Sequence, residues 1–78
     1  MPHAYPKGFP MFRTGDEVWF RYRTLTKDEY ISLTIPHQNP FMTIRGRTYL
    51  VGYDRYDRDD FDMKRYRVKN IMDLRITN

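Results

Sequence analysis

Tyrosine and arginine side chains gather in two short segments in the second half of this 78-residue chain. The segments read RTYLVGYD (47–54) and MKRYRVKN (63–70). In both, residue types alternate with period two, which is typical of β-strands. If the alternation extends two residues before the first segment, it places these residues on one face: Arg45, Arg47, Tyr49, Val51 and Tyr53. It places Arg65 and Arg67 on one face of the second, opposite Tyr66 and Val68.

If these two segments pair, the result is an arginine-rich surface beside tyrosine rings. Guanidinium groups bind phosphate by flat, bidentate hydrogen bonds, and aromatic rings stack on nucleic-acid bases. The sequence therefore predicts a binding site for a ligand or for nucleic acid, made of Arg47, Tyr49, Arg65 and Arg67. A second interpretation stays open, in which Tyr49 and Val51 fill the core and the arginines are merely solvated. In a binding experiment, Arg75→Gln on the last expected strand would serve as the charge-matched control for Arg67→Gln.

The overall charge favours an anionic partner. The formal net charge is +4, and arginine is the commoner of the two basic residues. A nucleic acid or a nucleotide is the partner that this composition suggests, the alternative being a basic surface without a ligand.

The chain offers little for catalysis or for metal binding. Ser32 is the only serine and stands inside an expected strand. His3 and His37 lie in proline-rich segments, without a second ligand three or four residues away. There is no cysteine, and the four glycines form no phosphate-binding loop. We therefore predict a protein that is not an enzyme and that has no catalytic residues, no cofactor and no metal.

An acidic turn separates the two segments. Its aspartates are Asp54, Asp57, Asp59, Asp60 and Asp62. A calcium loop would need a glycine at the bend and a late glutamate, whereas here Arg55 and Arg58 interrupt the carboxylates. Local ion pairs between arginine and aspartate are the expected arrangement.

Length and composition indicate one folded domain. Seventy-eight residues suffice for a single small core, and 40% hydrophobic with 31% charged residues is typical of a folded chain. The absence of cysteine, of a signal peptide and of any apolar run of about 18 residues leads us to expect a cytoplasmic protein without a membrane partner.

Alternation elsewhere predicts an all-β fold. Strands are expected near residues 17–24, 30–35, 41–45, 47–54, 63–68 and 73–76, with a polar loop at 26–29 and one tight helical turn at 69–71. The predicted core consists of Phe20, Leu33, Ile35, Leu50, Val68, Ile71 and Leu74. Five or six short strands favour a small antiparallel barrel, because closure removes exposed sheet edges.

The N-terminal residues 1–14 are expected to form an extended, proline-rich arm before a barrel domain at 15–78. Their apolar residues are Tyr5, Phe9, Met11 and Phe12, so the arm should pack on the barrel or on a partner. Extended proline-rich segments dock well on sheet edges and in aromatic grooves. The arm therefore supports an alternative function, that of a phage-type inhibitor or adaptor that docks on a host protein.

Two blocks of the sequence resemble the signature blocks of the WYL domain family. They read YLVGYD (49–54) and KRYRVKNI (64–71). The family's first block contains Trp-Tyr-Leu, for which this chain has Thr48-Tyr49-Leu50. Its second block reads roughly Arg-x-Phe-Arg-Leu-Asp-Arg-Ile, and here Tyr66, Arg67 and Ile71 stand at the Phe, the central Arg and the closing Ile. Lys69 and Asn70 replace the acidic residue and the second Arg. The resemblance covers residues 17–76.

This resemblance implies an Sm-like barrel, akin to the Src-homology-3 shape. It implies a stand-alone domain of a phage or bacterial regulator that binds a ligand or nucleic acid, since no segment fits the helix-turn-helix that usually precedes a WYL domain. It places Tyr49 and Arg67 at the family's ligand-site positions. The missing Trp and second Arg leave the ligand open.

Overall fold

The computed structural model describes residues 5–54 and 63–77. Within them it contains six strands and one short 3-10 helix. They are β1 (Glu17–Arg23), β2 (Asp28–Thr34), β3 (Phe41–Ile44), β4 (Arg47–Asp54), β5 (Lys64–Arg67), η1 (Val68–Asn70) and β6 (Ile71–Ile76). The predicted all-β fold is confirmed, and each expected strand occurs within two residues of its expected bounds.

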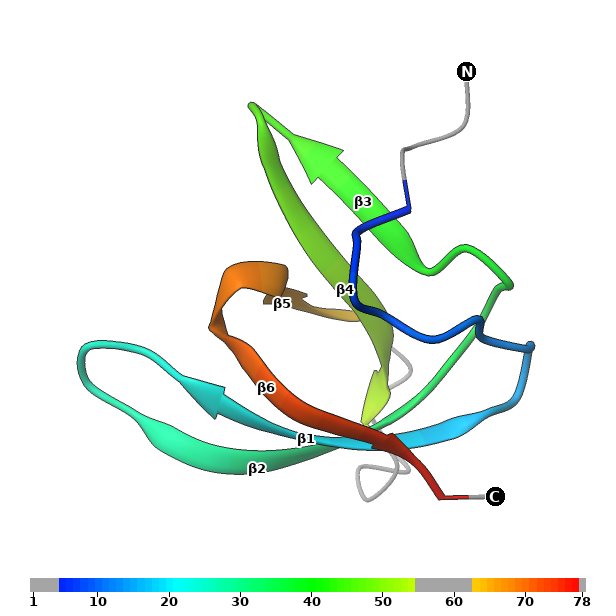
Figure 1. The fold of residues 1–78 in the computed structure, drawn as a ribbon, viewed down its shortest axis with the longest axis horizontal. Coiled ribbons are helices and arrows are strands. Elements are labelled where there is room, and N and C mark those ends of the chain that lie inside the picture. The colour runs from blue at the N-terminus through cyan, green and yellow to red at the C-terminus, as the bar shows by residue number, and fades with distance from the viewer. Residues whose placement is uncertain (1–4, 55–62, 78) are drawn as a thin grey trace.

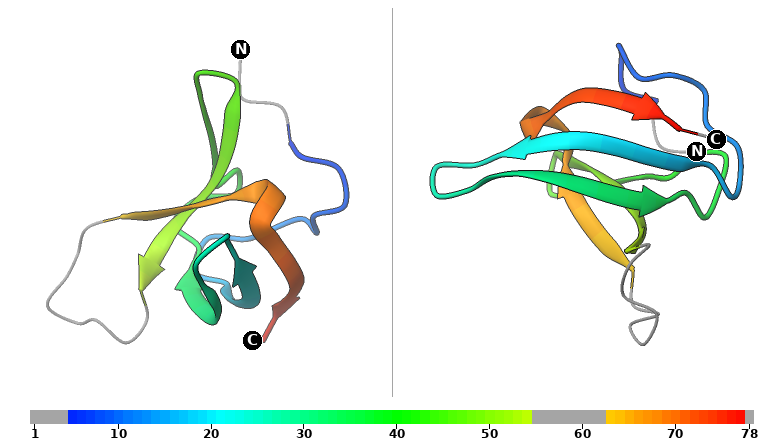
Figure 2. Two further views of the ribbon diagram at one scale, coloured as in Figure 1. Left: turned by 90° about the vertical axis from the view of Figure 1, so that its left-hand side faces the viewer. Right: turned by 90° about the horizontal axis from the view of Figure 1, so that it is seen from below.

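The strands form one curled antiparallel sheet, a half-barrel, in the order β3-β4-β2-β1-β6, with β5 paired to β4. Figure 1 shows the β1–β2 hairpin and the β3–β4 hairpin pointing in different directions, and Figure 2 shows β1, β2 and β6 lying side by side. The curl gives the molecule two outward surfaces, one over β1, β2 and β6 and the other over β3, β4 and β5.

Strand β4 joins the two parts of the sheet. Its first half pairs with β3, its middle with β5, and its last two residues with Leu33 and Thr34 of β2. Gly52 lies at this junction, where an added Cβ would stand 2.9 Å from the Thr34 carbonyl oxygen and 3.2 Å from the Leu33 Cβ. Glycine is therefore required there because the β2 backbone passes so close.

The core lies inside the curl. Its buried apolar residues are Phe12, Val18, Phe20, Leu33, Ile35, Phe41 and Leu50. Four predicted core residues are thus confirmed as fully buried: Phe20, Leu33, Ile35 and Leu50. The other three, Val68, Ile71 and Leu74, pack against this cluster but are only partly buried. Because β6 ends the sheet and pairs only with β1, its inward side chains have neighbours on one side only.

The described part of the N-terminal arm packs on the sheet. Phe12 is buried, and the rings of Tyr5 and Phe9 meet Phe41 edge-on at centroid distances of 4.9 and 5.2 Å. The Tyr5 hydroxyl donates to the Pro10 carbonyl oxygen at 2.6 Å, and burial raises the pKa of this phenol. The arm's aromatic rings therefore complete the core of the chain itself.

Two local expectations need correction. Asp28 and Glu29 belong to β2 and not to a loop; the connection is shorter and is closed by the Thr24 N–H, which donates to the Lys27 carbonyl oxygen at 2.8 Å. The Asp28 carboxylate draws these residues into the strand because it accepts hydrogen bonds from the Arg21 guanidinium on β1. Similarly, β6 begins at Ile71, directly after η1, and not at Asp73.

Candidate ligand-binding surface

The register of β4 and β5 brings the four predicted site residues onto one face. Tyr49 lies directly opposite Arg67, and Val51 lies opposite Arg65. Directly paired residues share a face of the sheet, and Arg47 shares it as well because it is two residues from Tyr49. Leu50, on the opposite face, is completely buried. We refer to the outward surface of Arg47, Tyr49, Arg65 and Arg67 as the tyrosine–arginine face.

This arrangement decides which face of β4 is buried, a point that the sequence leaves open. Tyr49 is half-buried on the outward side, and Arg47 and Arg65 are exposed. The interpretation in which Tyr49 fills the core is therefore wrong, because the inward positions of β4 belong to Leu50 and Gly52.

Arg45 does not belong to the strand face, contrary to the sequence alternation. It forms the two-residue turn between β3 and β4 together with Gly46, and both have positive φ, 50° and 76°. Such turns favour Asn-Gly, and a left-handed Arg costs roughly 1–2 kcal/mol. The hairpin tip thus carries a second exposed guanidinium beside Arg47, at a position where turn geometry alone would favour asparagine.

Neighbours on both sides hold the Tyr49 ring in place. The Arg65 guanidinium carbon lies 5.6 Å from the ring centroid, within the range of a cation–π contact. On the β3 side, Met42 is the direct cross-strand partner of Tyr49. The ring therefore contacts the Arg65 guanidinium on one side and faces the strand position of Met42 on the other.

Arg67 is positioned by contacts that anchor β5 to the core. Its backbone N–H donates to the Tyr22 hydroxyl oxygen at 3.1 Å. The neighbouring Tyr66 ring points inward and meets Tyr22 and Phe20 edge-on at 5.0 and 5.5 Å, and burial raises the pKa of Tyr66. With Tyr66 fixed inside, strand alternation directs the Arg67 side chain outward.

Two shallow hollows meet at Arg67. One is lined by Gly46, Arg47, Thr48, Arg67, Val68 and Lys69, and the other by Thr24, Leu25, Thr26, Arg67, Lys69 and Asn70. Every charged residue in both linings is a cation. The hollows therefore suit an anionic group such as phosphate.

The arginines of this face have no carboxylate partner among the described residues. Arg47, Arg65 and Arg67 form no ion pair there, whereas Arg21 and Arg23 both pair with Asp28, and Lys64 pairs with Asp54 at 3.2 Å. The remainder of the acidic turn, with its expected Arg–Asp pairs, lies outside the described residues.

An apolar groove adjoins the tyrosine–arginine face, and it was not predicted from the sequence. It is lined by Pro36, His37, Asn39, Pro40, Phe41, Met42, Val51 and Met63. Met42 is paired with Tyr49, so the groove begins beside the Tyr49 ring. The available signal in the sequence was the pair Pro36 and Pro40, which bracket a loop directly before Met42.

No group of three or more potential metal ligands lies together within residues 5–54 and 63–77. In the same part of the chain, no helix is both long and apolar enough to cross a membrane. Comparisons of the sequence with protein-family models and curated proteins, and of the fold with solved structures, give no match. The WYL resemblance and the ligand-site roles of Tyr49 and Arg67 therefore stay predictions.

Proposed function

We propose that this chain is a non-enzymatic binding module that holds single-stranded nucleic acid, or a single nucleotide, on the tyrosine–arginine face. One observation carries the proposal: Arg47, Arg65 and Arg67 lie beside an outward Tyr49 ring, without a carboxylate partner among the described residues. Cations left uncompensated on a rigid sheet attract an anion from solution.

The contacts indicate which residues would bind the phosphate groups and which would bind the bases. Phosphate groups would bind at Arg67 and Arg47, with Lys69 adding charge in the same hollow. A base would stack on the Tyr49–Arg65 pair, since both a tyrosine ring and a guanidinium plane accept a stacked base. A neighbouring base would enter the apolar groove that begins at Met42.

A single strand fits this surface better than a duplex. Among the described residues there is no α-helix to enter a major groove, and the site lies on short strands of a curled sheet. Aromatic rings with adjacent cations on a sheet bind unstacked bases and their backbone.

The finer assignment is part of the same proposal. We place the half-barrel among Sm-like barrels and the chain among stand-alone WYL-like regulators of phage or bacterial type. The support is the pairing of Tyr49 with Arg67 across β4 and β5, because these are the two residues that the resemblance assigns to the ligand site.

A second candidate function is docking on a host protein. The N-terminal arm no longer supports it, because the described arm packs on the chain's own core. The observations that favour it are the apolar groove with the exposed Met42 and Met63, and a fully exposed Leu25 at the tip of the β1–β2 hairpin. Methionine-rich surfaces adapt readily to protein partners.

Fluorescence anisotropy with a labelled single-stranded oligonucleotide tests the proposal. Arg67→Gln should weaken binding by about 1.5–3 kcal/mol, since a hydrogen bond to a charged group is lost. Arg13→Gln is the control, because this substitution removes the same charge from an exposed residue on the arm. Arg75→Gln is unsuitable, because Arg75 lines a different hollow.

The salt dependence separates the two candidate functions. Binding through phosphates should fall with a log–log slope of about −0.7 per phosphate neutralised. No binding of oligonucleotides or nucleotides by the wild-type chain at low salt would contradict the proposal and leave protein docking. Equal weakening by Arg67→Gln and Arg13→Gln would mean that only net charge matters.

A further inference from the structure

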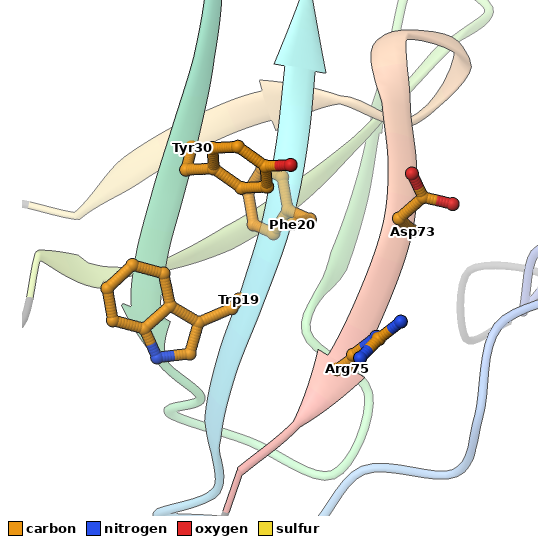
Figure 3. Close-up of a pocket in the computed structure, with 5 residues that line it drawn as sticks. All are labelled: Trp19, Phe20, Tyr30, Asp73 and Arg75. Atoms are coloured by element: carbon orange, nitrogen blue, oxygen red, sulfur yellow. The ribbon is translucent and has the colours of Figure 1, made fainter.

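A second hollow lies on the outward surface of β1, β2 and β6 (Figure 3). It is lined by Trp19, Phe20, Tyr30, Asp73 and Arg75 and measures about 450 Å³, within the ~300–1,000 Å³ range of small-molecule sites. None of these residues belongs to the tyrosine–arginine face.

Two large rings from neighbouring strands form one side of this hollow. Trp19 pairs with Ser32 and Tyr30 pairs with Arg21, so Trp19 and Tyr30 are diagonal neighbours on one face. Figure 3 shows the Trp19 indole lying across β2 and the Tyr30 ring reaching over β1. Tyr30 is 70% exposed, so the fold makes little use of its ring. The pair offers flat apolar surface to a ligand.

A β-bulge places both charged residues at the hollow. The register of β1 and β6 shifts between Trp19↔Arg75 and Arg21↔Met72, so Asp73 and Leu74 together oppose Phe20. Asp73 takes a left-handed φ of 55°. Bulges redirect side chains beside functional sites. Because of the extra residue, Leu74 packs on the core and Arg75 lies on the same outward face as Trp19. Without the bulge, alternation from Met72 would turn Arg75 inward.

A buried hydroxyl on the same face has no hydrogen-bond partner. Ser32, directly opposite Trp19, is only 7% exposed, and its Oγ is unpaired in the described structure. Leaving such a group unpaired is unfavourable, because the hydroxyl has lost its water partners without gaining others. Ser32 lies beneath this face and does not itself line the hollow.

The charges around the hollow narrow the ligand class. Arg21 and Asp28 neutralise each other by two hydrogen bonds, whereas Asp73 and Arg75 have no ion-pair partner among the described residues. One free acceptor and one free cation beside two rings match a flat heterocycle that bears an amino group and an anionic group. A purely cationic ligand would meet Arg75.

We propose that this hollow is a second binding site, which accepts a nucleotide unit whose base carries an amino group. The base stacks on Trp19 and Tyr30, its amino group donates to the Asp73 carboxylate, and Arg75 binds the phosphate. Adenine, cytosine and guanine carry such a donor, whereas thymine and uracil do not. The proposal does not depend on the tyrosine–arginine face.

Tryptophan fluorescence gives a direct test, because Trp19 is the only tryptophan in the chain. The full chain is titrated with AMP, CMP, GMP and UMP, with free N-acetyltryptophanamide as the correction for absorption by the bases. Saturable quenching is expected for the first three, with binding of UMP at least about fivefold weaker.

Variants then assign the contacts. Arg75→Gln should weaken AMP binding about tenfold or more and leave adenosine unaffected, since only the phosphate contact is lost. Tyr30→Leu should weaken binding of both ligands, and the control Arg13→Gln, on the exposed arm, should change neither. Far-UV circular dichroism checks that the exposed substitutions leave the fold intact.

Three results would overturn the proposal. They are the absence of saturable quenching by any nucleotide, equal affinities of wild type and Arg75→Gln for AMP, and saturable quenching by tetramethylammonium in place of AMP. Loss of oligonucleotide binding in Arg67→Gln with unchanged quenching by AMP would show that the two sites are separate.

Discussion

The β1–β2 pair and the β4–β5 pair, on the two outward surfaces of the sheet, both carry arginines beside aromatic rings, yet they use arginine differently. Over β1 and β2, Arg21 donates two hydrogen bonds to Asp28, and Arg23 lies 3.4 Å from the same carboxylate. Over β4 and β5, Arg47, Arg65 and Arg67 have no carboxylate neighbour among the described residues. The presence of a carboxylate in the register, and not the number of arginines, separates a structural cation from one left for a ligand.

The largest effect is expected beneath both surfaces. Leu33 is fully buried, and its strand pairs with both β1 and β4. Leu33→Ala should lower the free energy of unfolding by about 2–5 kcal/mol, measured by urea denaturation. Binding at both surfaces should fall together as the fold is lost. An unchanged denaturation midpoint would contradict the assigned strand faces.

The junction between the surfaces should be the next most sensitive position. Gly52→Ala would bring a Cβ to 2.9 Å from the Thr34 carbonyl oxygen, so β2 or β4 has to shift. We expect a loss of about 1–3 kcal/mol in thermal unfolding. Gly8→Ala is a poor control because Gly8 has a positive φ of 87°; Thr48→Ala, on the same strand, is a better one. Equal stability of Gly52→Ala and wild type would show that the strands do not cross this closely.

A smaller effect tests how Tyr49 is held. A double-mutant cycle of Arg65→Gln and Tyr49→Leu should give a coupling of about 0.5–1 kcal/mol in unfolding, as expected for an exposed cation–π pair. Pairing Arg67→Gln with Tyr49→Leu supplies the comparison, and its coupling should be smaller because no such ring contact exists between them. A zero coupling for Arg65 would mean that the guanidinium does not rest on the ring.

The smallest effect concerns the paired arginines. Hydrogen bonds from Arg21 lower the pKa of Asp28 below its ordinary value, so this pair stabilises the fold above that ordinary value, near 4. Its contribution should disappear as the pH falls through the depressed pKa of the folded state. In thermal melts from pH 6 to pH 2, Asp28→Asn should therefore show a slightly weaker acid dependence than wild type. Parallel curves would contradict this account of the pair.

Alternation in the sequence was sufficient to predict which side chains share a face within a regular strand. The inward faces of Phe20, Leu33 and Leu50, and the shared face of Tyr49 and Arg67, follow from period two, which any regular strand obeys. Arg45 is the exception: alternation assigned it to the strand face, whereas it forms the β3–β4 turn with Gly46.

Features that depend on distant partners could not be predicted. Packing of Tyr5 and Phe9 on Phe41 joins residues more than thirty positions apart, and the sequence did not indicate whether the arm would meet the barrel or a partner. The bulge at Asp73 is a single change of φ, which alternation cannot reveal, yet it places Arg75 beside Trp19. For that reason the sequence suggested Arg75→Gln as a control for Arg67→Gln, whereas the structure places Arg75 in the lining of a hollow.

One crossed measurement tests the central claim most directly. Arg67→Gln and Arg21→Gln each remove one positive charge from the outward side of the sheet, and both oligonucleotide affinity and Tm are measured for each at low salt. Arg67→Gln should weaken binding by about 1.5–3 kcal/mol with an unchanged Tm, whereas Arg21→Gln should lower Tm and leave the affinity unchanged. Equal loss of affinity in both variants, or an affinity loss confined to Arg21→Gln, would contradict the account.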